Sequence, residues 1–156
     1  MDRVPMTEQG KRNLQEELNQ LKNVERPKIS ADIEEARGHG DLKENAEYHA
    51  AKEKQGLVEA RIRFLEDQVA RAEVIDVSGL STDKVVFGLT VTLYDANLDK
   101  EMKYRIVGDV ESNLEKGDIS INSPIARALI GKQEGDIALV QAPGGERELE
   151  IVSIDK

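Results

Sequence analysis

The sequence predicts an α+β protein in which an N-terminal antiparallel two-helix coiled-coil hairpin precedes a small β-rich domain. In residues 1–76, apolar residues recur at helical spacing and turn residues are scarce. In residues 77–156, short alternating segments are separated by turns that contain Gly and Pro. We therefore expect a hairpin over residues 1–76 and a globular domain over residues 77–156.

The first helix is expected to begin after Thr7, because Thr is a good N-cap residue. Two apolar triplets follow, and each steps by four and then three residues, which places it on one helix face. The phase of the second triplet differs by one residue from that of the first, and Pro27 lies between them. Since Pro lacks a backbone N–H and clashes with the preceding turn, we expect a kink or irregularity there. The triplets are Leu14, Leu18 and Leu21, and Ile29, Ile33 and Ala36.

The second helix is expected to run from Asp41 to about Glu73. Two helices of about 30 residues each extend about 45 Å, and the short connection at Gly38–Gly40 makes them antiparallel neighbours. Apolar stripes that meet only each other indicate a two-helix coiled coil. The predicted stripe of the second helix consists of Ala46, Ala50, Leu57, Ala60, Phe64, Leu65, Val69 and Ala72.

Strand signals dominate the second half. Val91–Leu93 and Lys103–Val107 are apolar segments typical of strands, and the second of them is followed by a turn signal. Residues 137–140 and 148–151 flank Pro143-Gly144-Gly145-Glu146, which predicts a β-hairpin.

One short helix interrupts these strands. Ser123 is a suitable N-cap, Pro124 fits the first helical position, and Gly131 closes the segment. About 80 residues of strands and one helix are near the lower size at which a single core suffices.

Composition excludes several functional classes. The formal net charge of −9 argues against a free nucleic-acid binder, whose surface carries a basic patch. Five aromatic residues are too few for a base-stacking platform. The absence of Cys excludes disulfides and thiolate metal sites and fits a reducing cytoplasm. No apolar run reaches the roughly 20 residues of a membrane span.

The turn between the two helices carries two carboxylates, Asp41 and Glu44, and their pattern has two interpretations. Asp-x-x-Glu at a helix start resembles a capping box, in which each side chain satisfies a backbone N–H. The same acids could instead chelate a metal ion. Because Mg²⁺ prefers six oxygen ligands, two carboxylates alone would hold it poorly, but they could complete a site built from another protein's acids.

The segment from Ala36 to Glu53 resembles the tip signature of the Gre transcript-cleavage factors, and specifically their GreA-like members. The likeness extends in matching order over most of the chain. It includes Pro5-Met6-Thr7, Arg26-Pro27, Val74–Val77, Tyr104–Gly108, Ile119–Ala126, Leu129–Lys132 and Pro143–Glu146.

This resemblance implies a coiled-coil hairpin joined to an FKBP-like domain that docks on bacterial RNA polymerase. The hairpin enters the secondary channel, where tip acids help to hold a catalytic Mg²⁺ and activate water. The polymerase then cleaves its own backtracked RNA, so the factor itself is not an enzyme. We expect a monomer without a membrane attachment, and a tip that is inactive in solution.

The resemblance also assigns roles to single residues at the tip. Asp41 and Glu44 match the catalytic acids, which share Mg²⁺ with the polymerase only. Arg37 and Lys52 match basic contacts to the extruded 3′ segment of the nascent RNA, although both are equally explained as solubilising charges.

Two further groups of residues are assigned by resemblance. Asn45 and Tyr48 are expected to support the tip, and Tyr48 is alternatively a packing residue. The start of a helix is the competing explanation for Ser123 and Pro124. The predicted polymerase-docking residues are Asp118, Ser120, Ser123 and Pro124.

Two other functions remain as alternatives. An inhibitor of the same family type would plug the channel without promoting cleavage, although such relatives carry more acids in the turn. A prolyl isomerase is suggested by the FKBP-like domain, but that activity needs an aromatic-lined pocket, and the second half has only Phe87, Tyr94 and Tyr104.

Overall fold

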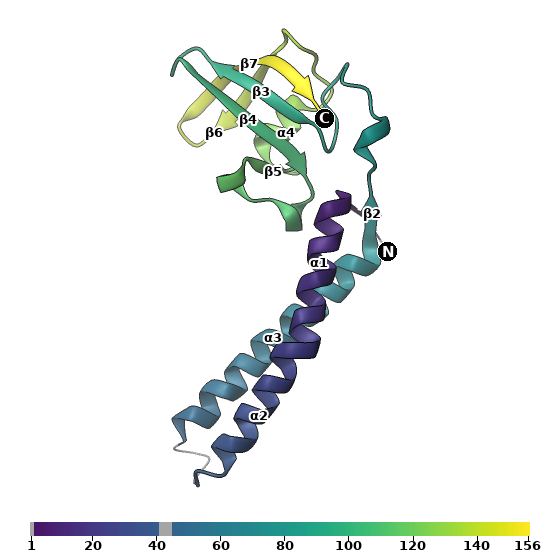
Figure 1. Cartoon of the computed structure of the whole chain (residues 1–156). Coiled ribbons are helices and arrows are strands. Elements are labelled where there is room, and N and C mark those ends of the chain that lie inside the picture. The colour runs from purple at the N-terminus through teal and green to yellow at the C-terminus, as the bar shows by residue number, and fades with distance from the viewer. Residues whose placement is uncertain (1, 41–44) are drawn as a thin grey trace. The chain divides into compact units, whose positions relative to one another are not determined.

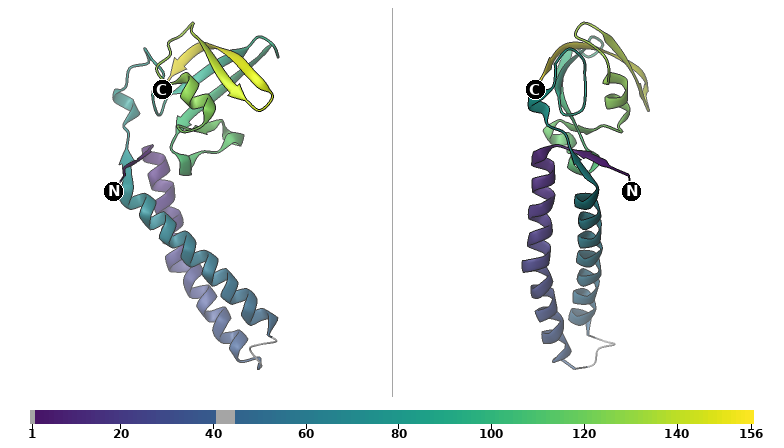
Figure 2. Two further views of the ribbon diagram at one scale, coloured as in Figure 1. Left: turned by 180° about the vertical axis from the view of Figure 1, so that it is seen from behind. Right: turned by 90° about the vertical axis from the view of Figure 1, so that its right-hand side faces the viewer.

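The computed structural model describes residues 2–40 and 45–156 and contains both predicted parts (Figure 1). In the hairpin, α1 (Glu8–Gln20) is followed by a π-helical turn (Leu21–Glu25) and by α2 (Arg26–Arg37). The returning helix α3 spans Ala46–Arg71 and lies alongside them (Figure 2). None of the helices in the described ranges has the length and hydrophobicity needed to cross a bilayer.

The π-helical turn confirms the irregularity expected near Pro27. Within it, the Arg26 amide donates to the Leu21 carbonyl, five residues earlier instead of four. The π-helical turn contains one residue more than an α-helical turn, so the positions that face the other helix shift by one residue after it. This shift is the phase difference between the two triplets. Leu14, Ile29, Ile33 and Ala36 are buried and Leu18 and Leu21 half-buried, as predicted.

The predicted stripe of α3 is wrong over its first two thirds. Leu57 is 67% exposed and Phe64 is 42% exposed, while Ala46, Ala50 and Ala60 are exposed as well. A second series, with strict alternating steps of three and four residues, is buried or half-buried along the whole helix. It consists of Tyr48, Ala51, Gln55, Val58, Ile62, Leu65, Val69 and Ala72.

Ion pairs connect the helices on either side of this seam. Arg26 makes a two-pronged contact with Glu59 at 2.8 Å. Arg61 pairs in the same way with Glu17 at 2.7 and 3.0 Å. The Arg61 guanidinium also lies 5.3 Å from the centre of the Phe64 ring, so a cation–π contact partly covers this exposed aromatic side chain.

The β-rich part is a five-stranded sheet in the order β5-β4-β3-β7-β6. The strands are β3 (Thr90–Asp95), β4 (Lys100–Val107), β5 (Asp118–Ser120), β6 (Ile137–Ala142) and β7 (Gly145–Asp155). All pairings are antiparallel except that of β4 with β5. The expected strands and the β6–β7 hairpin are therefore confirmed.

One face of this sheet packs against α4 (Pro124–Leu129), whose N-cap is Ser123 as predicted. The core between them is formed by alternate residues of the strands, such as Val91 and Leu93, together with Ala126 and Leu129 of α4. The α+β class is therefore confirmed.

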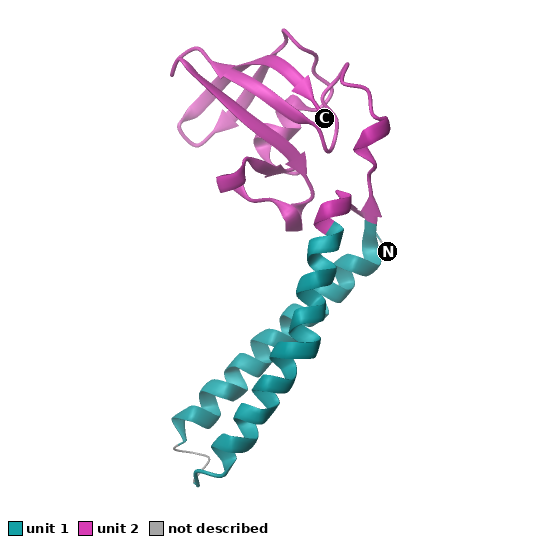
Figure 3. Cartoon of the chain, in the orientation of Figure 1, with its two compact units in different colours: residues 1–2, 11–72 teal, residues 3–10, 73–156 magenta. Residues whose placement is uncertain are grey.

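The chain divides into two compact units (Figure 3). One comprises residues 1–2 and 11–72, and the other comprises residues 3–10 and 73–156. The second unit contains the sheet and also β1 (Val4–Met6), which pairs with β2 (Ala72–Val74). Residues 3–10, which we assigned to the hairpin from sequence, are thus part of the unit that contains the sheet.

Candidate functional site

The end of α2 leads directly into the turn that carries the candidate acids. After Arg37, the Gly38 amide donates to the Glu35 carbonyl at 3.1 Å. Gly40 has a φ of +113°, which L side chains rarely adopt. Glycine is therefore required by the backbone at this point of the turn.

Asn45 organises the other side of the turn. Its side-chain oxygen accepts from the Tyr48 amide at 3.0 Å, which makes Asn45 the N-cap of α3. Its side-chain nitrogen donates to the Ala36 carbonyl at 2.5 Å. One amide side chain thus caps α3 and links it to the end of α2, which gives the predicted tip support a specific form.

The start of α3 corrects a prediction from sequence. The helix begins at Ala46 instead of Asp41, and the N-cap position that we assigned to Asp41 is held by Asn45. The acids themselves, Asp41 and Glu44, lie outside the described residues. The N-cap position of α3 is therefore held by Asn45, and the interpretation that placed Asp41 at that position is wrong.

The basic candidates lie on the two helices that border the turn. Arg37 is exposed in the last turn of α2. Lys52 is exposed on α3, and its ammonium donates to the Gln55 side chain at 3.2 Å. His39, next to the turn, lies 3.3 Å from the Glu47 carboxylate. Both predicted RNA-contact residues are therefore accessible to a ligand from outside.

Tyr48 is half-buried and belongs to the inward-facing series of α3. Its ring also makes an edge contact with the ring of His49, with centroids 5.6 Å apart. Packing is therefore a sufficient explanation for Tyr48.

No group of three or more His, Asp or Glu side chains among residues 2–40 and 45–156 is placed to hold a metal ion. The donor set that sequence proposes for Mg²⁺ consists of Asp41 and Glu44 alone. Two carboxylates fit Mg²⁺ chemically as oxygen donors, but only as part of a larger ligand set.

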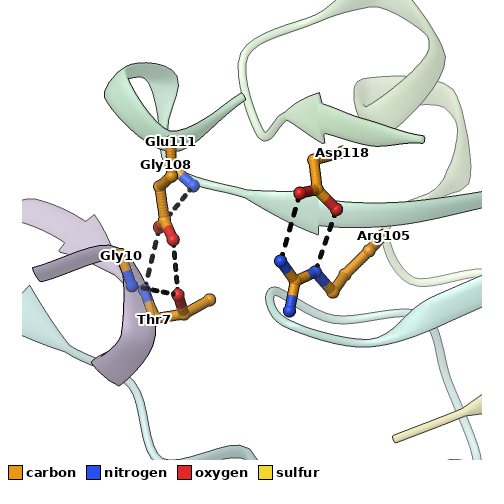
Figure 4. A network of polar contacts seen from close by, with 6 residues as sticks. All are labelled: Thr7, Gly10, Arg105, Gly108, Glu111 and Asp118. Carbon is orange, nitrogen blue, oxygen red and sulfur yellow. Dashed lines mark hydrogen bonds and ion pairs between the residues drawn. The ribbon is translucent and has the colours of Figure 1, made fainter. Parts of the chain in front are cut away.

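The predicted docking residues lie in the unit with the sheet, and Figure 4 shows one of them, Asp118, beside Arg105. The Arg105 guanidinium donates to both oxygens of Asp118 at 3.0 and 3.1 Å. The Ser120 hydroxyl donates to Asp109 and accepts from the Asn122 amide at 3.0 Å. The bonds of Arg105 join β4 to β5, and the bonds of Ser120 join the start of the loop after β5 to Asp109 and Asn122.

Ser123 and Pro124 begin α4, as the competing interpretation expected. The Ser123 hydroxyl accepts from the Ala126 amide at 3.2 Å. A helix start accounts for both residues, and a docking role for them stays a prediction.

Glu111 was missed by sequence reasoning, although it holds the first turn of α1 (Figure 4). Its carboxylate accepts from the Thr7 amide at 2.8 Å, from the Thr7 hydroxyl and from the Gly108 amide at 3.0 Å. The Thr7 hydroxyl in turn accepts from the Gly10 amide at 3.0 Å, which confirms Thr7 as the N-cap. A capping box normally takes its acid from the third helical position, which is Gly10 here, so no local pattern could indicate Glu111.

Comparison with known proteins covers both halves of the chain. The family model described as transcription elongation factor, N-terminal, matches residues 4–74. The model described as transcription elongation factor, GreA/GreB, C-term, matches residues 80–156. The chain belongs to the GreA/GreB family of transcription elongation factors.

Individual GreA/GreB relatives are similar over their full length. A transcription elongation factor GreA of Nitrosococcus oceani is 60% identical over 155 residues, which is 99% of this chain and 98% of the relative. One of Anaeromyxobacter sp. is 58% identical over 154 residues, covering 99% and 93%. Among solved structures, the GreA factor homolog 1 of Thermus thermophilus matches 99% of both chains with 26% identity and a TM-score of 0.46.

Proposed function

We propose that this chain is an accessory factor that binds bacterial RNA polymerase and stimulates it to cleave backtracked RNA. The hairpin enters the secondary channel of the polymerase, and the globular domain docks at the channel rim. Support comes from membership of the GreA/GreB family and from full-length relatives named transcription elongation factor GreA.

One observation carries the assignment of the tip acids. Asn45 caps α3 and ties it to the Ala36 carbonyl, so helix capping needs neither Asp41 nor Glu44. We infer that the two carboxylates of the turn act on a partner and do not occupy the N-cap position of α3. This supports the catalytic interpretation over the structural one.

In the proposed mechanism, Asp41 and Glu44 contribute carboxylate oxygens to a Mg²⁺ ion that the acids of the polymerase otherwise hold. Bound Mg²⁺ supplies charge stabilisation and a water of lowered pKa for hydrolysis of the phosphodiester. Asn45 fixes the start of the helix beside the acids. Arg37 and Lys52, both exposed, balance the phosphate charges of the displaced RNA 3′ segment.

The test uses a stalled, backtracked elongation complex with Mg²⁺, followed by sizing of the RNA. The wild-type protein should shorten the RNA, and Asp41→Asn or Glu44→Gln should reduce the stimulated rate by at least about tenfold. Polymerase binding should stay within a few-fold, because docking relies on other residues. Glu47→Gln, which removes a neighbouring exposed acid, serves as the matched control and should keep full activity.

The same assay separates the inhibitor alternative. A channel-plugging inhibitor would slow elongation without shortening the RNA, and replacing its tip acids would not abolish any cleavage. If Asp41→Asn cleaved as well as the wild type, the catalytic assignment would be wrong.

A further inference from the structure

The strand β6 is an edge strand without the usual protection. Among residues 2–40 and 45–156 it pairs with β7 alone, at the end of the five-stranded sheet, and Figure 2 shows the β6–β7 hairpin from a second side. Its residues, Ile137–Ala142, include no charged residue and no proline. Natural edge strands usually carry Lys, Pro, a bulge or a cover, because their free N–H and C=O groups otherwise pair with another chain.

The face of this hairpin that points away from the core is apolar on β6. Ile137 is 56% exposed and Leu139 is 51% exposed, whereas their neighbours Ala138 and Val140 are buried in the core. On β7, Val152 is 45% exposed beside the register shift between β3 and β7. Three large apolar side chains are therefore exposed on two adjacent strands of the sheet.

Acidic side chains complete the same face. Glu150 lies directly opposite Ile137, and Glu148 lies opposite Leu139. Both are exposed. The one basic residue of the two strands, Arg147, pairs with the buried Val140 and donates to the buried Asp95 at 3.0 Å, so it belongs to the other face. We call Ile137, Leu139, Glu148, Glu150 and Val152 the outer hairpin face.

We propose that the outer hairpin face and the free edge of β6 bind an extended segment of a partner protein that carries alternating basic and apolar residues. The backbone of this segment adds a strand to β6. Its Lys or Arg side chains lie on the outer face, where their aliphatic stems cover Ile137 and Leu139 and their charged groups reach toward Glu148 and Glu150. Its apolar side chains point to the opposite face, the core side of the sheet. Strand addition obtains affinity from main-chain hydrogen bonds and specificity from alternate side chains.

The negative charge of the outer hairpin face favours a basic partner segment over a second copy of the chain. Each copy carries a formal net charge of −9, and a pair of outer hairpin faces would bring four glutamates together. Like charges at an interface disfavour association, whereas a basic segment is attracted to the same surface. The surface is also at the opposite sheet edge from β5 and its predicted docking loop, so the proposal does not depend on the proposed function.

The experiment titrates the full-length, ¹⁵N-labelled protein with a synthetic peptide of alternating Lys and Val that is acetylated and amidated. A peptide of alternating Glu and Val is the control ligand. We expect the Lys-Val peptide to shift the amide resonances of β6 and β7, and its Kd to rise at least about tenfold when salt is increased from low to high concentration. The Glu-Val peptide should not bind.

Two variants test the residues. Leu139→Lys places a charge on the edge strand, and Glu148→Gln with Glu150→Gln removes the acids with little change of shape. Each should raise the Kd of the Lys-Val peptide at least about tenfold, and the double variant should also reduce its salt dependence. Leu114→Lys, at a leucine that is 72% exposed in the 3₁₀ turn Leu114–Lys116, is the matched control and should bind like the wild type.

Several results would overturn the proposal. These are absence of shifts in β6 and β7, equal binding of both peptides, and unchanged binding by the glutamine double variant with wild-type thermal stability. Sedimentation showing a dimer that Leu139→Lys dissociates would assign the surface to self-association instead. RNA-cleavage stimulation is measured on the same variants and should be unchanged, which keeps this test separate from that of the tip.

Discussion

At the scale of single residues, Asn45 has the clearest structural role at the tip. It satisfies a backbone donor of α3 and bonds the last turn of α2, so it acts on both sides of the turn. The sequence pattern placed this cap at Asp41 and assigned Asn45 only to support of the tip. In the structure the cap is Asn45, whose backbone is extended with φ of −86° and ψ of 96°.

We predict that Asn45→Ala lowers the free energy of unfolding by about 1 kcal/mol, because an N-cap side chain is lost. Asn45→Asp should retain most of the wild-type stability, and Asp41→Ala should change the free energy of unfolding by less than about 0.5 kcal/mol. Urea unfolding followed by circular dichroism measures all three. A larger loss for Asp41→Ala than for Asn45→Ala would contradict the assignment of the cap.

Asp95 illustrates a second residue-scale effect, which depends on pH. Its side chain is only 2% exposed at the end of β3. The hydrogen bond from Arg147 holds the pKa of the Asp95 carboxyl below its ordinary value, against the opposing effect of burial, and the amides of Leu98 and Asn97 contribute to the lowering. A lowered folded-state pKa means that the stabilisation is complete above the unfolded-state pKa and is lost as pH falls through the folded-state pKa.

We therefore predict that Arg147→Leu moves acid unfolding to higher pH. Removing the guanidinium raises the pKa of Asp95 toward the ordinary value of about 3.9, so protonation begins at higher pH during acidification. Urea midpoints measured from neutral pH down to about pH 3 give the profile. In Asp95→Asn the part of the pH dependence that comes from this carboxyl should vanish. If the urea midpoint of that variant fell on acidification as steeply as that of the wild type, the proposed role of Asp95 in acid unfolding would be wrong.

At the scale of elements, α3 carries two apolar repeats on different faces. The inward series runs through Val58, Ile62 and Leu65, and the outward series includes Leu57 and Phe64. Both have helical spacing, and Leu57 and Phe64 fit a helical stripe as well as the inward residues do. Both series also fit the 3.5-residue repeat that stays on one seam of a coiled coil. The inward series has no charged residue from Tyr48 to Ala72, whereas the outward series has Glu53 and Asp67 at the corresponding positions.

We predict that Ile62→Ala, at a side chain 1% exposed, lowers the free energy of unfolding by about 2–5 kcal/mol. Leu57→Ala, on the outward face, should change it by less than about 0.5 kcal/mol. Both are measured by the same denaturant series in the full chain. Similar losses for the two variants would mean that the seam is misassigned.

At the scale of the whole molecule, the boundary between units does not follow the chain order. Residues 3–10 belong with residues 73–156, and the Ile75 amide donates to the Met6 carbonyl at 2.9 Å. Strand β1 also comes so close to Gly108 that an added Cβ would lie 2.3 Å from the Pro5 carbonyl oxygen. A fragment that starts at residue 77 therefore lacks part of its own unit.

We predict that an isolated 77–156 fragment is less stable than the same unit within the full chain by at least about 2 kcal/mol. The Glu111 carboxylate loses two donors from Thr7, and hydrogen bonds to a charged group contribute roughly 1.5–3 kcal/mol each. Hydrogen exchange at Glu111 and Gly108 should accelerate accordingly. Equal exchange in the fragment and the full chain would show that residues 3–10 contribute nothing to this unit.

Local patterns predicted much of the fold. The helical spacing around Pro27, the Ser123-Pro124 helix start and the glycine turn between β6 and β7 are short-range signals, and each was confirmed. They are readable because backbone hydrogen bonds and steric limits act within a few residues of the chain.

The sequence by itself determined the α+β class, the hairpin and the positions of the acids in the turn. Tertiary structure alone decided that Asn45 caps α3, that Ile62 faces inward instead of Phe64, and that Glu111 completes the cap at Thr7. For Asn45 and Ile62 other residues satisfy the local rule equally well, whereas no local rule indicates Glu111. The choice depends on which partner lies opposite, and in the case of Glu111 that partner is 104 positions away in the chain.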